Sequence, residues 1–257
     1  MFSEVKQFSD KVESLKGSSG SCIKSAMYHI EKAEVLSEID PEMAIFRLIT
    51  AEEEAATAII LMLKEHGYEG ASKLNKNNHL HKQCMYPFVC AVADLLGRHL
   101  KEISGSPPDF VWDKVGKIDA IRLRLKINLA GKAVIAEMRP PLNFQLSTGE
   151  VLHNFKDELI TFLKSKGFED TVKHLKDNAN IRNKLLYSDG EKIPNTLADT
   201  ENGKFARFGS YLLTKANVLI FLYFLTAPYK KDGKAAFVEQ LLSSYIELLQ
   251  HTKGQRL

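Results

Sequence analysis

The sequence predicts a mainly α-helical bundle with a small β-hairpin inserted at about 118–138. Apolar residues recur at helical intervals over most of the 257 residues, which is typical of amphipathic helices. Between 118 and 129 the period changes to two, as expected for a strand with one buried face. The alternating apolar positions are Ile121, Leu123, Leu125, Ile127 and Leu129.

The composition indicates an ordinary folded chain. Hydrophobic residues make up 44% and charged residues 26% of the sequence, which is enough apolar material for one large domain or two small ones. A formal net charge of +3 is too small by itself to indicate nucleic-acid binding. We expect one composite domain, with a first helical block at 1–104, an insertion at 105–150 and a second helical block at 151–257.

Three features predict a cytoplasmic protein without a membrane partner. The first six residues, Met-Phe-Ser-Glu-Val-Lys, contain an acidic residue before any apolar run, whereas a secretory signal has a basic start and a hydrophobic centre. The cysteines are Cys22, Cys84 and Cys90, an odd number without a CxxC pair, so we expect reduced thiols, with Cys84 and Cys90 in the core. The longest apolar concentration, Ala216–Pro228, is shorter than the roughly 20 apolar residues that span a bilayer, so we expect a buried helix there.

The first block begins with three predicted helices. Apolar spacing indicates a helix over 3–16, followed by a flexible break at Gly17–Ser21 and a second helix at about Cys22–Glu38. Asp40 followed by proline is the strongest helix start in the sequence. It begins a third helix, Pro41–His66.

The third helix carries an acidic residue on its apolar side. At 100° per residue, Glu52 points down the middle of the apolar stripe. A carboxylate that faces a core is costly unless it is paired or hydrogen-bonded. Glu52 is therefore expected to have a partner, most naturally a cation.

The first block ends with a polar segment, Ala71–Lys82, that opens a helix running to Leu100. Pro87 lies early enough in this helix to be tolerated or to kink it. Ser104–Pro108 contains a glycine and two prolines and is the clearest candidate boundary.

In the insertion, the strand at 118–129 is expected to turn at 130–132 into a second strand that ends at Met138. A helix is the alternative, through Val111, Val115, Ile118, Leu125 and Leu129; we favour the hairpin. Its basic outer residues, Arg122, Arg124 and Lys126, are interpreted as a solvated strand face rather than a phosphate-binding one.

The second block is predicted to be helical again. The expected helices are about 152–166, one through Val172 and Leu175, then Phe205–Ala227 and Ala235–His251. A loop is expected from Asp189 to Gly203.

The densest chemistry of the chain lies in this block, in the stretch Asn178–Gly190. Helical spacing places Asn183 and Tyr187 on one face, and Arg182 precedes them in a locally basic segment. Such an arginine can neutralise a phosphate through its fork of donors, while the adjacent amide orients a ribose hydroxyl or phosphate. The alternative is structural, with Arg182 and Glu52 forming a buried pair and Tyr187 packing its ring.

Other common catalytic signatures are absent from the sequence. It contains no glycine-rich phosphate loop, no GxSxG, no HExxH and no CxxC. His79 and His81 are two residues apart, so on a helix their rings point about 160° apart, and we interpret them as surface or capping residues rather than metal ligands. We expect neither a metal nor a cofactor.

The segment Ile181-Arg182-Asn183-Lys-Leu-Leu-Tyr187 resembles the HEPN superfamily, whose motif is an arginine, often followed by asparagine, and a histidine after four to six residues. Tyr187 stands where the family histidine would be. The helical Ala51-Glu52-Glu53, followed downstream by His79-Leu-His81-Lys82, is similar to the AbiV-type abortive-infection branch. The likeness covers both helical blocks and leaves the insertion at 105–150 without a counterpart.

The resemblance implies a helical bundle, commonly a homodimer, that functions in bacterial antiviral defence or a toxin–antitoxin system, with RNA or a cognate defence protein as partner. It implies a metal-independent endoribonuclease in which Arg182, Asn183 and Tyr187 are catalytic and Glu52, His79 and His81 are supporting residues. A phenol titrates near pH 10 and is a poor general base at neutrality, so His79, His81 or His174 would have to substitute for the missing histidine. The alternative is a catalytically degenerate RNA- or protein-binding regulatory subunit, and a further one is a helical scaffold without a ligand.

Overall fold

The protein is mainly helical, as predicted, and the predicted hairpin is part of a small three-stranded antiparallel sheet. This computed structural model describes residues 6–129, 131–138, 142, 147–148, 151–165, 167, 170, 204–229 and 236–251. Its helices are α1 (Lys6–Val12), α2 (Gly17–Leu36), α3 (Pro41–Glu65), α4 (His79–Gln83), α5 (Met85–Ser104), α6 (Phe155–Ser165), α9 (Lys204–Thr226) and α10 (Ala236–His251), with a 3₁₀ turn at Ala71–Lys73.

The chain forms two compact units that we describe separately. The described residues of unit 1 are 6–61, 76–86 and 204–223, and the remaining described residues form unit 2. The last residues of α3 and of α9 thus belong to unit 2. The predicted division at 104 and 150 stays a prediction.

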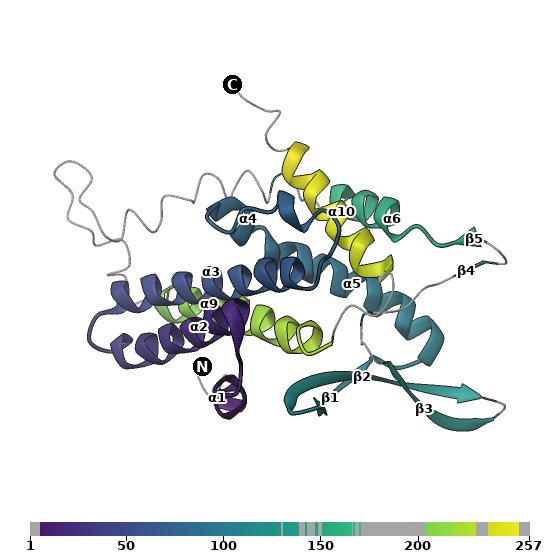
Figure 1. The fold of residues 1–257 in the computed structure, drawn as a ribbon, viewed down its shortest axis with the longest axis horizontal. Helices are drawn as coiled ribbons and strands as arrows, with labels where there is room; N and C mark the ends of the chain where they lie inside the picture. Colours follow the sequence, from purple (N-terminus) through teal and green to yellow (C-terminus); the bar gives the residue numbers. More distant parts are fainter. Residues whose placement is uncertain are drawn as a thin grey trace. The chain divides into compact units, whose positions relative to one another are not determined.

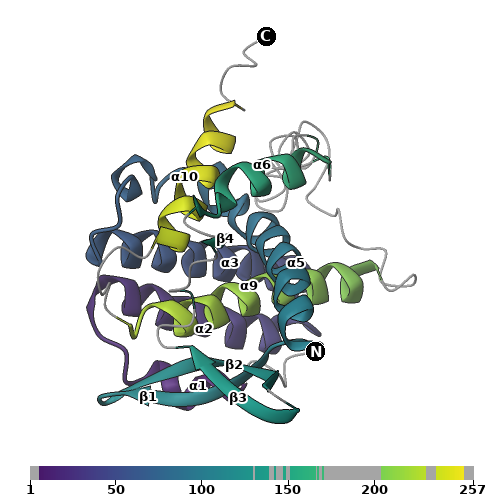
Figure 2. The ribbon, with the colours of Figure 1, turned by 90° about the vertical axis from the view of Figure 1, so that its right-hand side faces the viewer.

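In unit 1, helices α2, α3 and α9 run alongside one another (Figures 1 and 2). Two small residues bring α9 close to its neighbours. Gly209 faces α3, where an added Cβ would lie 3.6 Å from Ile45 and 3.8 Å from Leu48. Ser19 on α2 lies 3.3 Å from the hydroxyl of Tyr223 on α9, and this contact is buried.

The start of α2 corrects one expectation from the sequence. Residues Gly17–Ser21 were predicted to be a flexible break, but they form the first turns of the helix. Their small side chains serve close packing, because a Cβ on Gly20 would lie 3.0 Å from the Cβ of Leu15. Ser19 and Gly20 are buried, so the segment is a packing surface rather than a linker.

Helix α3 begins where the sequence predicted. The backbone N–H of Met43 donates to Oδ1 of Asp40 at 3.0 Å, which satisfies one of the free N–H groups of the first turn. Pro41 occupies the first helical position, where its missing N–H costs nothing.

The helix expected to run from the polar segment to Leu100 is divided into two helices, α4 and α5, at Cys84. Pro87 explains the division, because it has no N–H to donate to the carbonyl of Gln83 and its ring would crowd that group. In the observed structure, Pro87 is the third residue of α5, a position in the first turn where neither problem arises. Cys84 is buried as expected, whereas Cys90 on α5 is exposed, contrary to the prediction.

In unit 2, the insertion forms a sheet of three strands in the order β1 (Asp109–Val115), β2 (Ile118–Leu129) and β3 (Lys132–Met138) (Figure 2). The β2–β3 hairpin was predicted, whereas β1 was missed and the alternative helix is wrong. Both neighbours pair antiparallel with β2. Gly116 and Gly131 have φ angles of +62° and +80°, which suits the tight turns between the strands.

The alternation along β2 gives the sheet one buried face. Leu123 and Leu125 pack with Leu100 of α5 in one apolar cluster. On the other face, Arg122 pairs with Asp113 at 3.2 Å and also with Glu137. Acids therefore pair with both arginines of this face, Arg122 and Arg124. Lys126 is exposed as predicted, whereas Arg122 is only 13% exposed, so the face is solvated in part.

Helices α6 and α10 pack together in unit 2 (Figure 1). Phe155 of α6 and Phe237 of α10 share a buried cluster with Leu96 of α5. Two antiparallel strands of two residues each, β4 (Ser147–Thr148) and β5 (Val151–Leu152), precede α6.

One helical stretch of the described chain, Arg207–Thr226 of α9, is long and apolar enough to cross a membrane by length and composition. More than half of its most apolar window, 56%, is buried inside the structure. A buried core helix passes the same test, so the stretch is compatible with a soluble protein.

Candidate functional site

The three residues predicted to be catalytic, Arg182, Asn183 and Tyr187, lie outside the described residues, as does the predicted helix through Val172 and Leu175. The candidate site that the structure describes is formed by the acidic pair of α3 and the residues around it in unit 1. It contains the supporting residues Glu52 and His79.

Glu52 is only 2% exposed, and its partner is Lys215 of α9, which is 5% exposed. Lys215 Nζ lies 2.6 Å from Glu52 Oε1 in a buried ion pair. The expectation of a cationic partner is confirmed, although the cation considered from the sequence was Arg182. Lys215 is the one charged residue between Phe208 and Thr226 of α9, and this isolated charge was the signal that could have identified it.

Burial raises the pKa of Glu52 to about 7, and the attraction of Lys215 only partly opposes this rise. The environment around Lys215 is aromatic, because its Nζ lies 5.8 Å from the ring centre of Tyr86 and 5.4 Å from that of Tyr211. These rings meet edge to face at a centroid distance of 6.0 Å. They offer Lys215 cation–π contacts in place of water.

The adjacent carboxylate, Glu53, has the opposite electrostatic character. His79 Nδ1 lies 2.7 Å from its Oε1, and Lys82 donates to its Oε2 at 2.8 Å. Burial would raise the pKa of Glu53, but the hydrogen bonds and charges of Lys82 and His79 together lower it. Glu53 is therefore ionised near neutral pH, beside a neighbour that is half protonated at pH 7.

The short helix α4 places both donors on Glu53. Asn78 caps this helix by accepting from the N–H groups of Leu80 and His81, so His79 and Lys82 fall on consecutive turns of one face. His79 is half exposed, as interpreted from the sequence. His81 is buried, so a surface position was the wrong interpretation for it; its spacing from His79 turns it to the opposite side of α4.

At Glu52 the arrangement provides a buried carboxyl group that can change its protonation state near neutral pH. A carboxyl group with a pKa near 7 gains or loses a proton at working pH, which a general acid or base requires.

The chain matches no protein-family model, no curated protein and no solved structure.

Proposed function

We propose that this chain is a HEPN-like antiphage-defence or toxin-type protein that cleaves RNA without a metal ion, through Arg182, Asn183 and Tyr187. The observation that carries the proposal is the contact between Glu53 and helix α4. The resemblance rests partly on two segments that are 26 residues apart, and they meet at 2.7 Å through His79 and Glu53. Their contact supports a common structural role for both.

In this reaction the 2′-hydroxyl of RNA attacks the neighbouring phosphate and leaves a cyclic phosphate end. Arg182 neutralises the phosphate, and Asn183 orients it. The phenol of Tyr187 donates a proton to the leaving 5′ oxygen, since it is a poor base at neutral pH, and solvent water takes up the proton that the attacking 2′-hydroxyl loses. Without the histidine of the motif, cleavage is expected to be slow.

The test is to incubate the full chain with end-labelled single-stranded RNAs in the presence of EDTA. The incubation is carried out with and without a phage lysate as the source of an activator. We expect products with cyclic phosphate ends, lost in Arg182→Ala. Tyr187→His, which restores the motif, is expected to accelerate cleavage by at least about tenfold, in the range of general acid–base effects.

Arg124→Ala is the matched control. Arg124 lies on a strand of unit 2, and its charge is already compensated by Glu137, whose Oε1 lies 3.1 Å from Arg124 Nε. This variant is expected to cleave at the wild-type rate. The proposal is refuted if the folded protein cleaves none of the RNAs under either condition, or if Arg182→Ala cleaves as well as the wild type.

A second function, a degenerate RNA-binding or protein-binding subunit, is favoured by a single feature, Tyr187 in place of histidine. It predicts that Arg182→Ala weakens binding of RNA or of a partner, while neither the wild type nor Tyr187→His cleaves RNA. Filter binding with the same labelled RNAs separates the two functions.

A further inference from the structure

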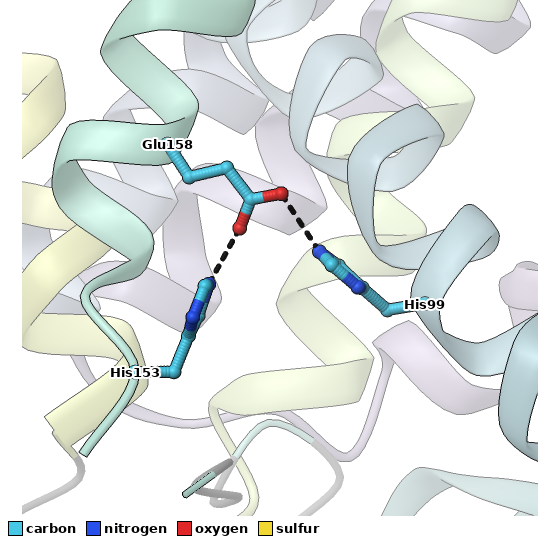
Figure 3. A group of neighbouring side chains, drawn as sticks. All are labelled: His99, His153 and Glu158. Carbon is cyan, nitrogen blue, oxygen red and sulfur yellow. Dashed lines mark hydrogen bonds and ion pairs between the residues drawn. The ribbon is translucent and has the colours of Figure 1, made fainter. Parts of the chain in front are cut away.

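Two histidines converge on one carboxylate in unit 2. His99 Nε2 lies 2.9 Å from Oε1 of Glu158, and His153 Nε2 lies 2.6 Å from Oε2 (Figure 3). One ligand-type atom from each of the three residues lies within 4.8 Å of the others. None of the three residues was predicted from the sequence to have a functional role.

Each member of the cluster is held by regular structure. His99 lies on α5, Glu158 in the first turn of α6, and His153 two residues before that helix. Asn154 caps α6 by accepting from the N–H groups of Lys156 and Asp157. Because a cap fixes the chain entering a helix, His153 is held at a defined distance from Glu158.

An aromatic core orients the two imidazole rings. Phe155 is buried and contacts His153 and His99 edge to face, at ring-centre distances of 4.5 Å and 6.2 Å. Its backbone N–H donates to Gln240 Oε1 of α10 at 2.9 Å. The rings are thus fixed with both Nε2 atoms facing the carboxylate, as Figure 3 shows.

We propose that His99, His153 and Glu158 form a binding site for a divalent transition-metal ion of the Zn²⁺ class. Two imidazoles and a carboxylate are a ligand set that zinc and non-haem iron use in proteins. With metal–ligand bonds of about 2.0–2.2 Å, ligand atoms of a tetrahedral site lie about 3.3–3.5 Å apart. The two observed contacts need to open by less than about 1 Å to admit the ion, which then replaces both hydrogen bonds.

The site has room for a further ligand. The side chains of His99, His153 and Glu158 are 26%, 35% and 31% exposed, so solvent reaches the cluster. Three protein ligands with one open position are typical of zinc sites that bind water or a substrate group, whereas closed structural sites have four protein ligands. The fourth ligand is therefore expected to be water.

The test is titration of the chelator-treated full chain with Zn²⁺ by calorimetry, and with Co²⁺ as a spectroscopic substitute. We expect one ion per chain and a tetrahedral Co²⁺ absorption spectrum without thiolate bands. His99→Gln, His153→Gln and Glu158→Gln are each expected to weaken binding by more than about tenfold, since even partners outside the ligand shell can contribute that much.

His79→Gln is the matched control. His79 also contacts a glutamate, Glu53, at 2.7 Å, but the second residue that contacts this glutamate is a lysine rather than a histidine. This variant is expected to bind Zn²⁺ as the wild type does. A measurement on the unaltered chain removes any dependence on variant folding: Zn²⁺ should protect His99 and His153, but not His79, from diethylpyrocarbonate.

The inference is overturned by any of three results: no Zn²⁺ binding, binding retained in all three ligand variants, or equal modification of His99 and His153 with and without Zn²⁺. In each case the cluster is a structural hydrogen-bonded triad. None of these measurements depends on RNA cleavage, so the metal site and the proposed function can fail separately.

Discussion

Replacement of Glu52 by glutamine is expected to change the pH dependence of stability. Because burial raises the pKa of Glu52 from 4.5 to about 7, the folded protein binds this proton more tightly than the unfolded chain does. The stability contributed by the protonated carboxyl group is therefore complete below pH 4.5, and it is lost as the pH rises through 7. Glu52→Gln has nearly the shape of the protonated carboxyl group but does not titrate, so its stability should not fall as the pH rises through 7.

The magnitude follows from the two pKa values. The rise of the Glu52 pKa from 4.5 to about 7 corresponds to about 3 kcal/mol. Between pH 5 and pH 8 the wild type is expected to lose about 2.5 kcal/mol of this contribution. The free energy of unfolding of Glu52→Gln, relative to that of the wild type, should therefore increase by that amount over the interval. The substitution also leaves Lys215 without an anionic partner, but the cost of this loss adds a constant difference and does not alter the change with pH.

Urea denaturation of both proteins at half-unit steps from pH 5 to pH 8 measures this difference. Glu53→Gln is the control at the next residue: the pKa of Glu53 is lowered, so the stability that depends on its charge is lost only below about pH 4.5, its ordinary pKa. A difference between the wild type and Glu52→Gln that stays constant from pH 5 to pH 8 would refute the reasoning. It would mean that Lys215 keeps Glu52 ionised throughout.

Three further substitutions test the packing and capping, each by urea denaturation at neutral pH. Asp40→Ala removes the cap acceptor of Met43 and should cost about 1 kcal/mol, whereas Asp40→Asn should cost little; equal effects would exclude capping as the cause. Gly20→Val adds a branched side chain where even a single added Cβ would lie 3.0 Å from the Cβ of Leu15, so a loss of about 1–3 kcal/mol is expected, and an unchanged urea midpoint would show that the contact yields freely. Leu125→Ala opens a cavity in the cluster below the sheet and should cost about 2–5 kcal/mol, with a loss below 1 kcal/mol contradicting its buried position.

Features determined by neighbouring residues were predictable from the sequence. The start of α3 follows from Asp40 and Pro41 alone, and the β2–β3 hairpin follows from the alternation along 118–129. The signal for β1 was weak because none of its residues is buried; they are exposed or half-buried. An edge strand of this kind has little of the period-two contrast by which β2 was recognised.

Features determined by distant residues were not predictable. The glycines and serines of 17–21 have the composition of a linker, and they are helical because Leu15 and Tyr223 pack against them. The need of Glu52 for a cation could be inferred from its place on the helix, but the identity of Lys215 depends on how α9 packs, 163 residues later in the chain. Periodicity identifies which side of a helix is buried and contains no information about its neighbour.

The clusters around Glu53 and Glu158 show why one is a salt bridge and the other a candidate metal site. Each is a carboxylate held by two donors, and in each the first donor is a histidine within 3 Å. The second donor differs: Lys82 is a charged ammonium group at neutral pH with no lone pair to offer, whereas His153 offers a ring nitrogen. Glu53 is also nearly closed to solvent, while Glu158 is about one-third exposed. A metal ion would therefore have to displace a buried, favourable charge pair at Glu53, but only two solvent-accessible hydrogen bonds at Glu158, and that difference in cost is what makes the second cluster the metal site.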